Sequence, residues 1–135
     1  MDSKAEKLLN GKNLVFLATT MSDGSPQVTP VWGNFEDSHI LINTAEGRLK
    51  HKNITRDPRV AISVVDIRNP LDMTSIRGKV VEILPDYDYK HADFLTMQYM
   101  GKENYPFKRP GEKRIILRIK PERIFVLPEL TMSDD

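Results

Sequence analysis

The sequence contains no cysteine, and this absence excludes several kinds of chemistry. Without a thiol, the protein has no disulfide, no thiolate metal site, no iron–sulfur cluster and no cysteine nucleophile. Aromatic residues are few, at 7% of the 135 residues, and tryptophan occurs once. The net charge is only +1, because 20 basic residues nearly balance 19 acidic ones. We therefore expect no nucleic-acid partner, since the surface is not basic overall and aromatic residues do not alternate with the basic ones.

Long apolar runs are also missing. No run approaches the roughly 20 apolar residues that a membrane-spanning helix needs. The first residues, MDSKAEKLLNGK, lack the apolar centre of an export signal. We therefore expect a cytoplasmic protein without membrane contact. The length predicts a single domain, residues 1–135.

Familiar catalytic motifs do not occur. The sequence has no HExxH, no GxSxG and no carboxylate pair at a diagnostic spacing. Its three histidines, His39, His51 and His91, are scattered, and we interpret them as surface residues rather than metal ligands. We assign no catalytic side chain and no metal site. If the protein is an enzyme, a bound cofactor carries the chemistry.

Basic residues gather in one segment, NTAEGRLKHKNITRDPRV, which begins at Asn43. The apolar runs HILIN and RVAISVV flank it, which indicates a short crossover between two strands. A helix here would place Arg48, Lys52 and Arg56 on one face and direct Lys50 elsewhere. Arginine and lysine together suit a phosphate or carboxylate group. A solvated basic face is the alternative interpretation.

The first part of the chain predicts a short helix and a hairpin. A capping-box spacing at Ser3 and a glycine at Gly11 bracket the helix. The apolar run NLVFLATT then indicates a strand buried on both faces at the centre of the sheet. Asp23 and Gly24 form a hairpin signal, after which QVTPVWGNFE is predicted to return as the second strand.

This second strand carries residues that are unusual in a central strand. Pro30 cannot donate to a ladder, and Gly33 leaves space beside the backbone. A bulge or sheet edge explains them, and so does a backbone platform against which a flat ligand lies. Trp32 is either a core anchor or a surface on which a ring stacks.

The rest of the sequence predicts further strands and one more helix. DIRNPLD is interpreted as a loop, and MTSIRGKVVEIL as a long strand that bends at Gly78. Asp86 is predicted to cap a helix over 87–100 that plugs a barrel, followed by a loop over a site and by the strands RIILRIK and RIFVL. We expect a mainly β fold, a six-stranded antiparallel split β-barrel with short flanking helices.

The order of these segments resembles the split-barrel flavin and deazaflavin proteins related to pyridoxamine 5'-phosphate oxidase. The resemblance rests on LATTMSDGSPQVTPVW, GRLKHKNITRDPRVAISV, IRGKVVEI and YMGKENYPFKRPGEKRIILRIKPERI, and it covers nearly the whole chain. It looks closest to the short subgroup that uses coenzyme F420, whereas other branches bind FMN. The GRLKHKN and RPGEKRIILRIKPERI segments are its most specific parts.

The resemblance implies a homodimer with two cofactor sites at the interface, each formed by both chains. It implies that the cofactor phosphate is held by basic residues after the third strand, and that the ring edge lies along the second strand. The cofactor-binding residues implied in this way are Gln27, Val28, Thr29, Pro30, Asn43, Thr44, Arg48, Lys50 and, as a helper, Lys52.

The implied activity is hydride transfer from reduced F420, or alternatively FMN, to a small conjugated or planar acceptor. Surplus cations such as Arg56 or Lys108 would favour F420 and its acidic glutamate tail. Relatives that oxidise pyridoxamine phosphate bear substrate-phosphate residues near their C-terminus, and PELTMSDD offers no equivalent, which argues against vitamin B6 oxidation. A non-catalytic cofactor carrier and a nucleic-acid-binding barrel are the alternatives, the second ranked lowest.

Overall fold

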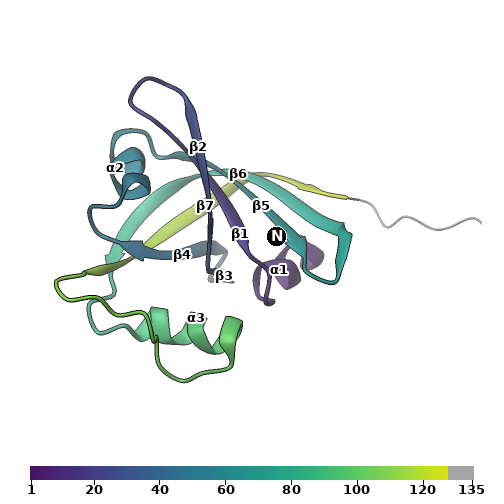
Figure 1. Ribbon diagram of the computed structural model, residues 1–135. Coiled ribbons are helices and arrows are strands. Elements are labelled where there is room, and N and C mark those ends of the chain that lie inside the picture. Colours follow the sequence, from purple (N-terminus) through teal and green to yellow (C-terminus); the bar gives the residue numbers. More distant parts are fainter. Residues whose placement is uncertain (128–135) are drawn as a thin grey trace, which may run out of the picture.

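The computed structural model describes residues 1–127 and shows a mainly β fold with three short helices. The helices are α1 (Ser3–Leu9), α2 (Leu49–Arg56) and α3 (Lys90–Met100). The strands are β1 (Val15–Thr20), β2 (Pro26–Val31), β3 (Gly33–Glu36), β4 (His39–Ala45), β5 (Arg59–Asp66), β6 (Asn69–Pro85) and β7 (Arg114–Val126). All seven belong to one antiparallel sheet in the order β2-β1-β5-β6-β7-β4-β3, which curls into a split barrel (Figure 1). The split barrel was predicted correctly, but with six strands.

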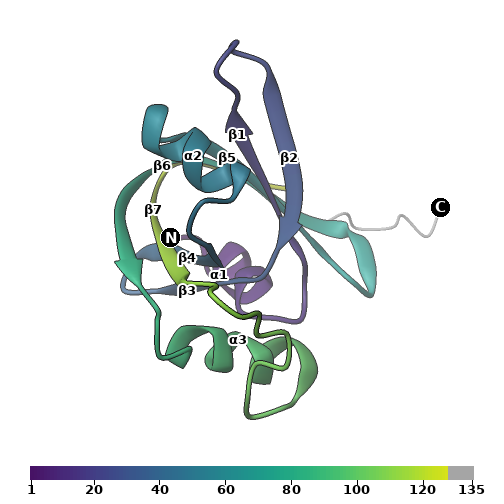
Figure 2. The ribbon, with the colours of Figure 1, turned by 60° about the vertical axis from the view of Figure 1, so that its left-hand side comes forward.

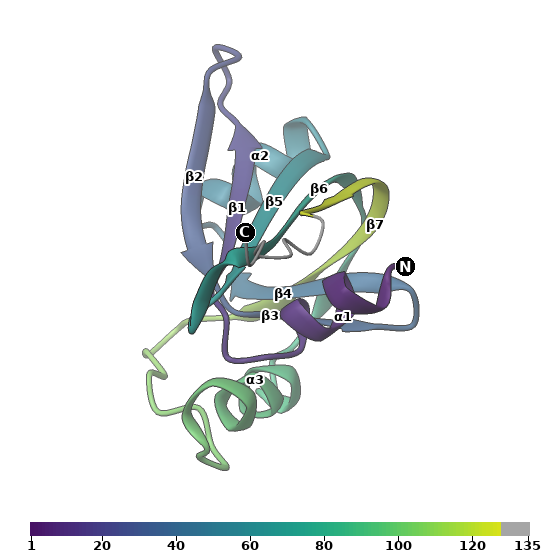
Figure 3. The same cartoon turned by 90° about the vertical axis from the view of Figure 1, so that its right-hand side faces the viewer.

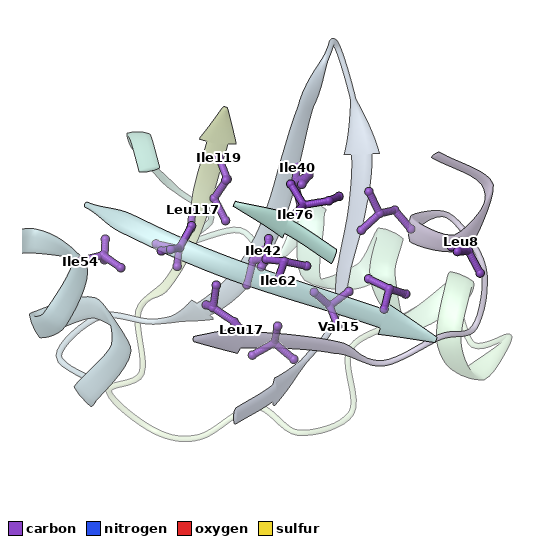
Figure 4. Packing of buried hydrophobic residues seen from close by; sticks show 14 of the residues in the cluster. Leu8, Val15, Leu17, Ile40, Ile42, Ile54, Ile62, Ile76, Leu117 and Ile119 are labelled. Carbon is purple, nitrogen blue, oxygen red and sulfur yellow. The ribbon is translucent and has the colours of Figure 1, made fainter. Parts of the chain in front are cut away.

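The core fills the inside of the curl. Alternate side chains of β5 and β7 point inward and are almost completely buried, as their period of two predicts. Leu8 and Leu9 of α1 and Ile54 of α2 join the same cluster (Figure 4). The two helices therefore pack onto the sheet through only a few apolar residues each.

The structure corrects the interpretation of β1. Val15 and Leu17 are fully buried, but Phe16 between them is 41% exposed. The strand is second from one edge of the sheet, next to β2, and not at its centre. A continuous apolar run was read as burial on both faces, whereas within this chain only one face of β1 is covered.

The predicted second strand is two strands. The chain breaks at Trp32, so that β2 pairs with β1 at one edge of the sheet and β3 pairs with β4 at the opposite edge. Gly33 permits the close pairing of β3 with β4, because a Cβ at this position would lie 3.0 Å from the carbonyl oxygen of Leu41. Pro30 is therefore in an edge strand, which is one of the two environments expected for it.

Later segments also differ from prediction. Asn69 to Asp72 belong to β6, so the expected loop is a tight hairpin between β5 and β6. The last two predicted strands form the single strand β7, which continues through Pro121. The strand pairing shifts register at Gly78, where a Cβ would collide with the carbonyl oxygen of Lys120. The bend expected at Gly78 is thus confirmed as a bulge.

Aspartate side chains cap the N-terminal ends of α1 and α3 by accepting hydrogen bonds from backbone N–H groups of the first turn. Asp2, not Ser3, caps α1, because its carboxylate accepts from the backbone N–H groups of Lys4 and Ala5. Asp86 accepts from the N–H groups of His91 and Ala92, as its predicted capping role requires, although α3 begins only at Lys90.

Helix α3 lies outside the curl, beside β3 and β4, as Figures 2 and 3 show. It does not plug the barrel, and none of its residues belongs to the core cluster. Its buried face explains this position, since His91 and Thr96 are polar and need hydrogen-bond partners. None of the helices in residues 1–127 is long and apolar enough to cross a membrane. The predictions for the C-terminal PELTMSDD fall on 128–135, outside the described residues.

Candidate functional site

Three cations gather at the N-terminal end of α2. Arg48 is the N-cap residue of α2, so the crossover for which the sequence left a helix open is helical. Lys50 is half-buried, and burial lowers the pKa of its ammonium group, as do the positive charges of Arg48 and Arg114. Arg114 lies beside the two predicted phosphate ligands, because Glu112 contacts both Arg48 and Arg114 and the charge of Arg114 acts on Lys50. Arg114 was not predicted as a site residue, because nothing in RIILRIK separates it from the other cations of that strand.

Hydrogen bonds hold the guanidinium of Arg114 in place. Its Nε donates to Oδ1 of Asn43 at 2.8 Å, and its Nη1 donates to Oε1 of Glu112 at 3.2 Å. The ring of Tyr105 lies 5.1 Å from the guanidinium carbon and covers it. Arg114 is only 7% exposed. The structure therefore fixes this cation more firmly than Arg48, whose side chain is 44% exposed.

Asn43 links Arg114 to a buried polar network. Its Nδ2 donates to Oδ2 of Asp86 at 2.8 Å and lies 2.9 Å from Nδ1 of His91. Nε2 of His91 lies 2.8 Å from Oδ1 of Asn34, so a neutral imidazole with its proton on Nε2 satisfies both contacts. The side-chain amide of Asn43 is thus fully engaged, and its part in this site is to position Arg114.

The structure contradicts the surface position expected for His91. The residue is buried between α3, β3 and β4, and burial lowers the pKa of its imidazole from 6.5 to about 4. The nearby Asp86 carboxylate opposes this shift, and Arg114 adds to it. No motif in the sequence signals such a histidine, since Asn34 and Asn43 are far from it along the chain.

A second hydrogen-bond network joins β2 to α2. The hydroxyl of Thr19 donates to Oε1 of Gln27 at 3.3 Å and accepts from Nδ2 of Asn53 at 3.0 Å. Arg56 donates to Oδ1 of Asn53 at 2.8 Å and to the carbonyl of Thr20 at 3.0 Å. These hydrogen bonds therefore hold β2, which is predicted to contact the ring, at a fixed position relative to α2, which carries the predicted phosphate ligands. Arg56 takes part in this network through Asn53 and Thr20.

Two predicted site residues carry buried hydroxyls without partners. Oγ1 of Thr29 and Oγ1 of Thr44 are inaccessible to solvent and make no hydrogen bond within residues 1–127. Leaving a buried hydroxyl unpaired costs about 1–3 kcal/mol, so such groups commonly serve a ligand. Both hydroxyls therefore fit a site that binds a polar molecule.

The remaining predicted residues lie at the margin of this site. Val28 and Pro30 are exposed, and they face the opposite side of β2 from Gln27 and Thr29 because strand residues alternate. The outer edge of β2 has no neighbouring strand in the described sheet, which leaves main-chain groups free. Lys52 is exposed and makes no ion pair with another described residue.

Comparison with known proteins identifies the family to which this fold belongs. The family described as pyridoxamine 5'-phosphate oxidase matches residues 1–127. The chain belongs to this family. A solved structure named F420 reductase is 30% identical, with a TM-score of 0.82 over 93% of this chain and 98% of that one.

Two more distant members of the fold show the same architecture. General stress protein 26 from Bacillus anthracis is 19% identical, with a TM-score of 0.68 over 93% of each chain. HupZ from Group A Streptococcus is 22% identical, with a TM-score of 0.64 over 94% of each chain. At these identities the likeness shows the fold alone.

The neutral His91 predicts a loss of stability in acid. The unfolded chain binds a proton at this residue near pH 6.5, but the folded chain does so only near pH 4. Unfolding therefore takes up a proton between these values, and the free energy of unfolding should fall by up to about 3 kcal/mol as the pH drops through this window.

Urea unfolding at pH 7 and at pH 4.5 measures this change. The His91→Gln variant should lose most of the pH dependence, whereas His39→Gln, a change at a partly exposed histidine, should keep it. An equal pH dependence in His91→Gln and the parent would contradict the assignment.

Proposed function

We propose that this chain is an F420-dependent oxidoreductase that acts on a small conjugated or planar acceptor. The cluster of Arg48, Lys50 and Arg114 supports this proposal most directly. Three cations together form a suitable site for a phosphate. The 30% identity to an F420 reductase supports a deazaflavin as the cofactor. FMN, which also bears a phosphate and a tricyclic ring, is the second candidate.

The cofactor phosphate is assigned to Arg48 and Lys50, with Lys52 as a helper and the Thr44 hydroxyl as a further partner. Asn43 contributes by holding Arg114. The ring edge is assigned to Gln27, Val28, Thr29 and Pro30, through the free main-chain edge of β2 and the unpaired hydroxyl of Thr29.

The residues of the chain position the cofactor and surround it with polar groups. When bound, a reduced deazaflavin or flavin supplies the hydride. No side chain is assigned to proton transfer, because His91 is buried and both of its ring nitrogens have partners. Orientation of the ring by β2 and of the phosphate by the three cations is the catalytic contribution that these residues can make.

Lys52 is the cation best placed to favour F420 over FMN. Arg56 is committed to Asn53 and Thr20, and Lys108 lies over the ring of Tyr89 at 4.5 Å. Lys52, beside the proposed phosphate site, forms no ion pair among the described residues, so it can meet an acidic glutamate tail.

The function is tested by titration followed by single-turnover kinetics. Purified protein is titrated with F420 and with FMN, and the visible spectrum gives an affinity for each. The reduced complex is then mixed with a series of planar acceptors in a stopped-flow instrument. Tight binding of F420 and acceptor reduction support the proposal. Tight binding without reduction of any acceptor identifies a cofactor carrier, and binding of neither cofactor refutes both.

Loss of either phosphate cation should weaken cofactor binding. Arg48→Ala and Lys50→Ala each remove a charged hydrogen bond, so each should cost roughly 1.5–3 kcal/mol of binding free energy. Isothermal titration calorimetry measures this loss. Lys79→Ala, at an exposed cation of β6, is the matched control and should bind as the parent does. Unchanged affinity in both site variants would rule out this position for the phosphate.

We also propose a homodimer with the cofactor sites at its interface. The strand registers place Pro30, Phe16, Ser63, Ser75 and Phe125 in one row across the outer face of the sheet. Both phenylalanines are exposed in the single chain, and small serines separate them. A sheet face with exposed aromatic residues suits an isologous interface. Because Pro30 belongs to this row, the ring side of the site borders the same face.

Light scattering tests the dimer. At micromolar concentration the parent protein should have twice the mass of one chain. Phe16→Glu or Phe125→Glu should give the monomer mass, since a charge in the interface would be desolvated. Ile67→Glu, at an exposed residue of the β5–β6 turn, should remain dimeric. A monomeric parent with cofactor bound would contradict the proposal.

A further inference from the structure

A buried carboxylate lies among the cations of the candidate site. Oε2 of Glu112 is 3.4 Å from Nη2 of Arg48, and Oε1 is 3.2 Å from Nη1 of Arg114. The side chain of Glu112 is only 8% exposed. It follows Gly111, whose φ of +76° turns the chain just before β7. Each oxygen of this carboxylate therefore serves one guanidinium.

The two ion pairs differ in strength. Arg114 also donates to Asn43 at 2.8 Å and lies under Tyr105, so its position does not depend on Glu112 alone. Arg48 has no other described side-chain partner, and its contact with Glu112 is long for a charged hydrogen bond. Arg48 can therefore exchange the carboxylate for another anion at little cost, whereas Arg114 stays in place.

A carboxylate and a phosphate present similar oxygen pairs to a guanidinium. With Glu112 in the cluster, one of the three positive charges is already neutralised. Burial is the main cause of the lowered pKa of Lys50, and the positive charges of Arg48 and Arg114 lower it further even with Glu112 between them. The cluster thus keeps an excess of positive charge for an incoming anion, but that anion must compete with Glu112 for Arg48.

We propose that Arg114 is a third anion-binding cation of this site, and that Glu112 occupies the phosphate position of Arg48 until a phosphate-bearing ligand replaces it. This inference rests on the proposed function in one respect, the assignment of the phosphate to Arg48 and Lys50. It adds that the negative charge of Glu112 lowers the affinity for the phosphate. Glu112 acts through the two arginines and makes no contact with the ring.

The Glu112→Gln variant tests the competition. Glutamine has nearly the same shape but no charge, so a phosphate-bearing ligand should bind about fivefold or more tightly. Calorimetric titration with FMN and F420 is compared with titration of riboflavin and of the corresponding deazaflavin that carries only the ribityl chain. Both of these compounds lack the phosphate. The affinity for the phosphate-free pair should not change. Glu82→Gln, in another Glu–Arg pair that joins β6 to Arg118 at 3.1 Å, is the matched control and should change neither affinity.

A second variant tests Arg114. Arg114→Gln is made in the Glu112→Gln background, where its removal leaves no buried carboxylate unpaired. Binding of the phosphate-bearing ligands should weaken about tenfold or more relative to Glu112→Gln alone. Equal affinity in the single and double variants would show that Arg114 does not contact the anion. Thermal unfolding confirms that each variant is folded, and Glu112→Ala replaces Glu112→Gln if the latter is not.

The outcomes separate this inference from the proposed function. If Arg48→Ala and Lys50→Ala bind normally, the phosphate site itself is wrong. If those variants lose affinity but Glu112→Gln binds the phosphate-bearing ligands no more tightly than the parent, only the competition is refuted. In that case Glu112 positions the guanidiniums, and its loss should weaken binding.

Discussion

The side-chain amide of Asn43 makes the contacts on which the arrangement of the site depends. Its oxygen accepts from Arg114 of β7, and its nitrogen donates to Asp86 and faces His91, so one buried group of β4 joins β7 to the start of α3. Asp86 in turn receives the first N–H groups of α3. A buried network of this kind is stable only when every member is satisfied, which ties the neutral state of His91 to the position of the Arg114 guanidinium. The same bonds that hold α3 outside the curl therefore orient a cation toward α2.

Much of the fold could be predicted, because period-two alternation and turn residues are local signals. The strands that contain RVAISVV and RIILRIK and the bend at Gly78 were predicted from such signals. The errors arise where contacts between distant segments decide how a strand pairs and which of its faces is buried. The break at Trp32 is not visible in QVTPVWGNFE. After it, the chain pairs with β4 at the other edge of the sheet and no longer with β1. Likewise, NLVFLATT cannot reveal whether its second apolar face is covered within the chain or by another molecule.

The site could be predicted only where its residues are close in sequence. Arg48, Lys50 and Lys52 stand out as a run of cations, and the structure places Arg114 beside the first two. Arg114 and Glu112 were missed because they come from a segment more than sixty residues away. His91 was misplaced for a related reason, since its burial depends on Asn34 and Asn43. Membership of the pyridoxamine 5'-phosphate oxidase family favours an oxidoreductase, and the buried hydroxyls of Thr29 and Thr44 make no hydrogen bond within residues 1–127.

The central claim is that one cofactor spans the free edge of β2 and the cation cluster at α2. The connection from Gln27 through Thr19 and Asn53 keeps these two parts at a fixed separation, so a ligand with a planar ring and a phosphate must fit both. A crystal structure of the protein with bound F420 measures this directly. The account predicts the phosphate within hydrogen-bond distance of Arg48 and Lys50, and the ring edge along residues 27–30. A phosphate bound away from α2, or a ring that does not touch β2, would contradict it.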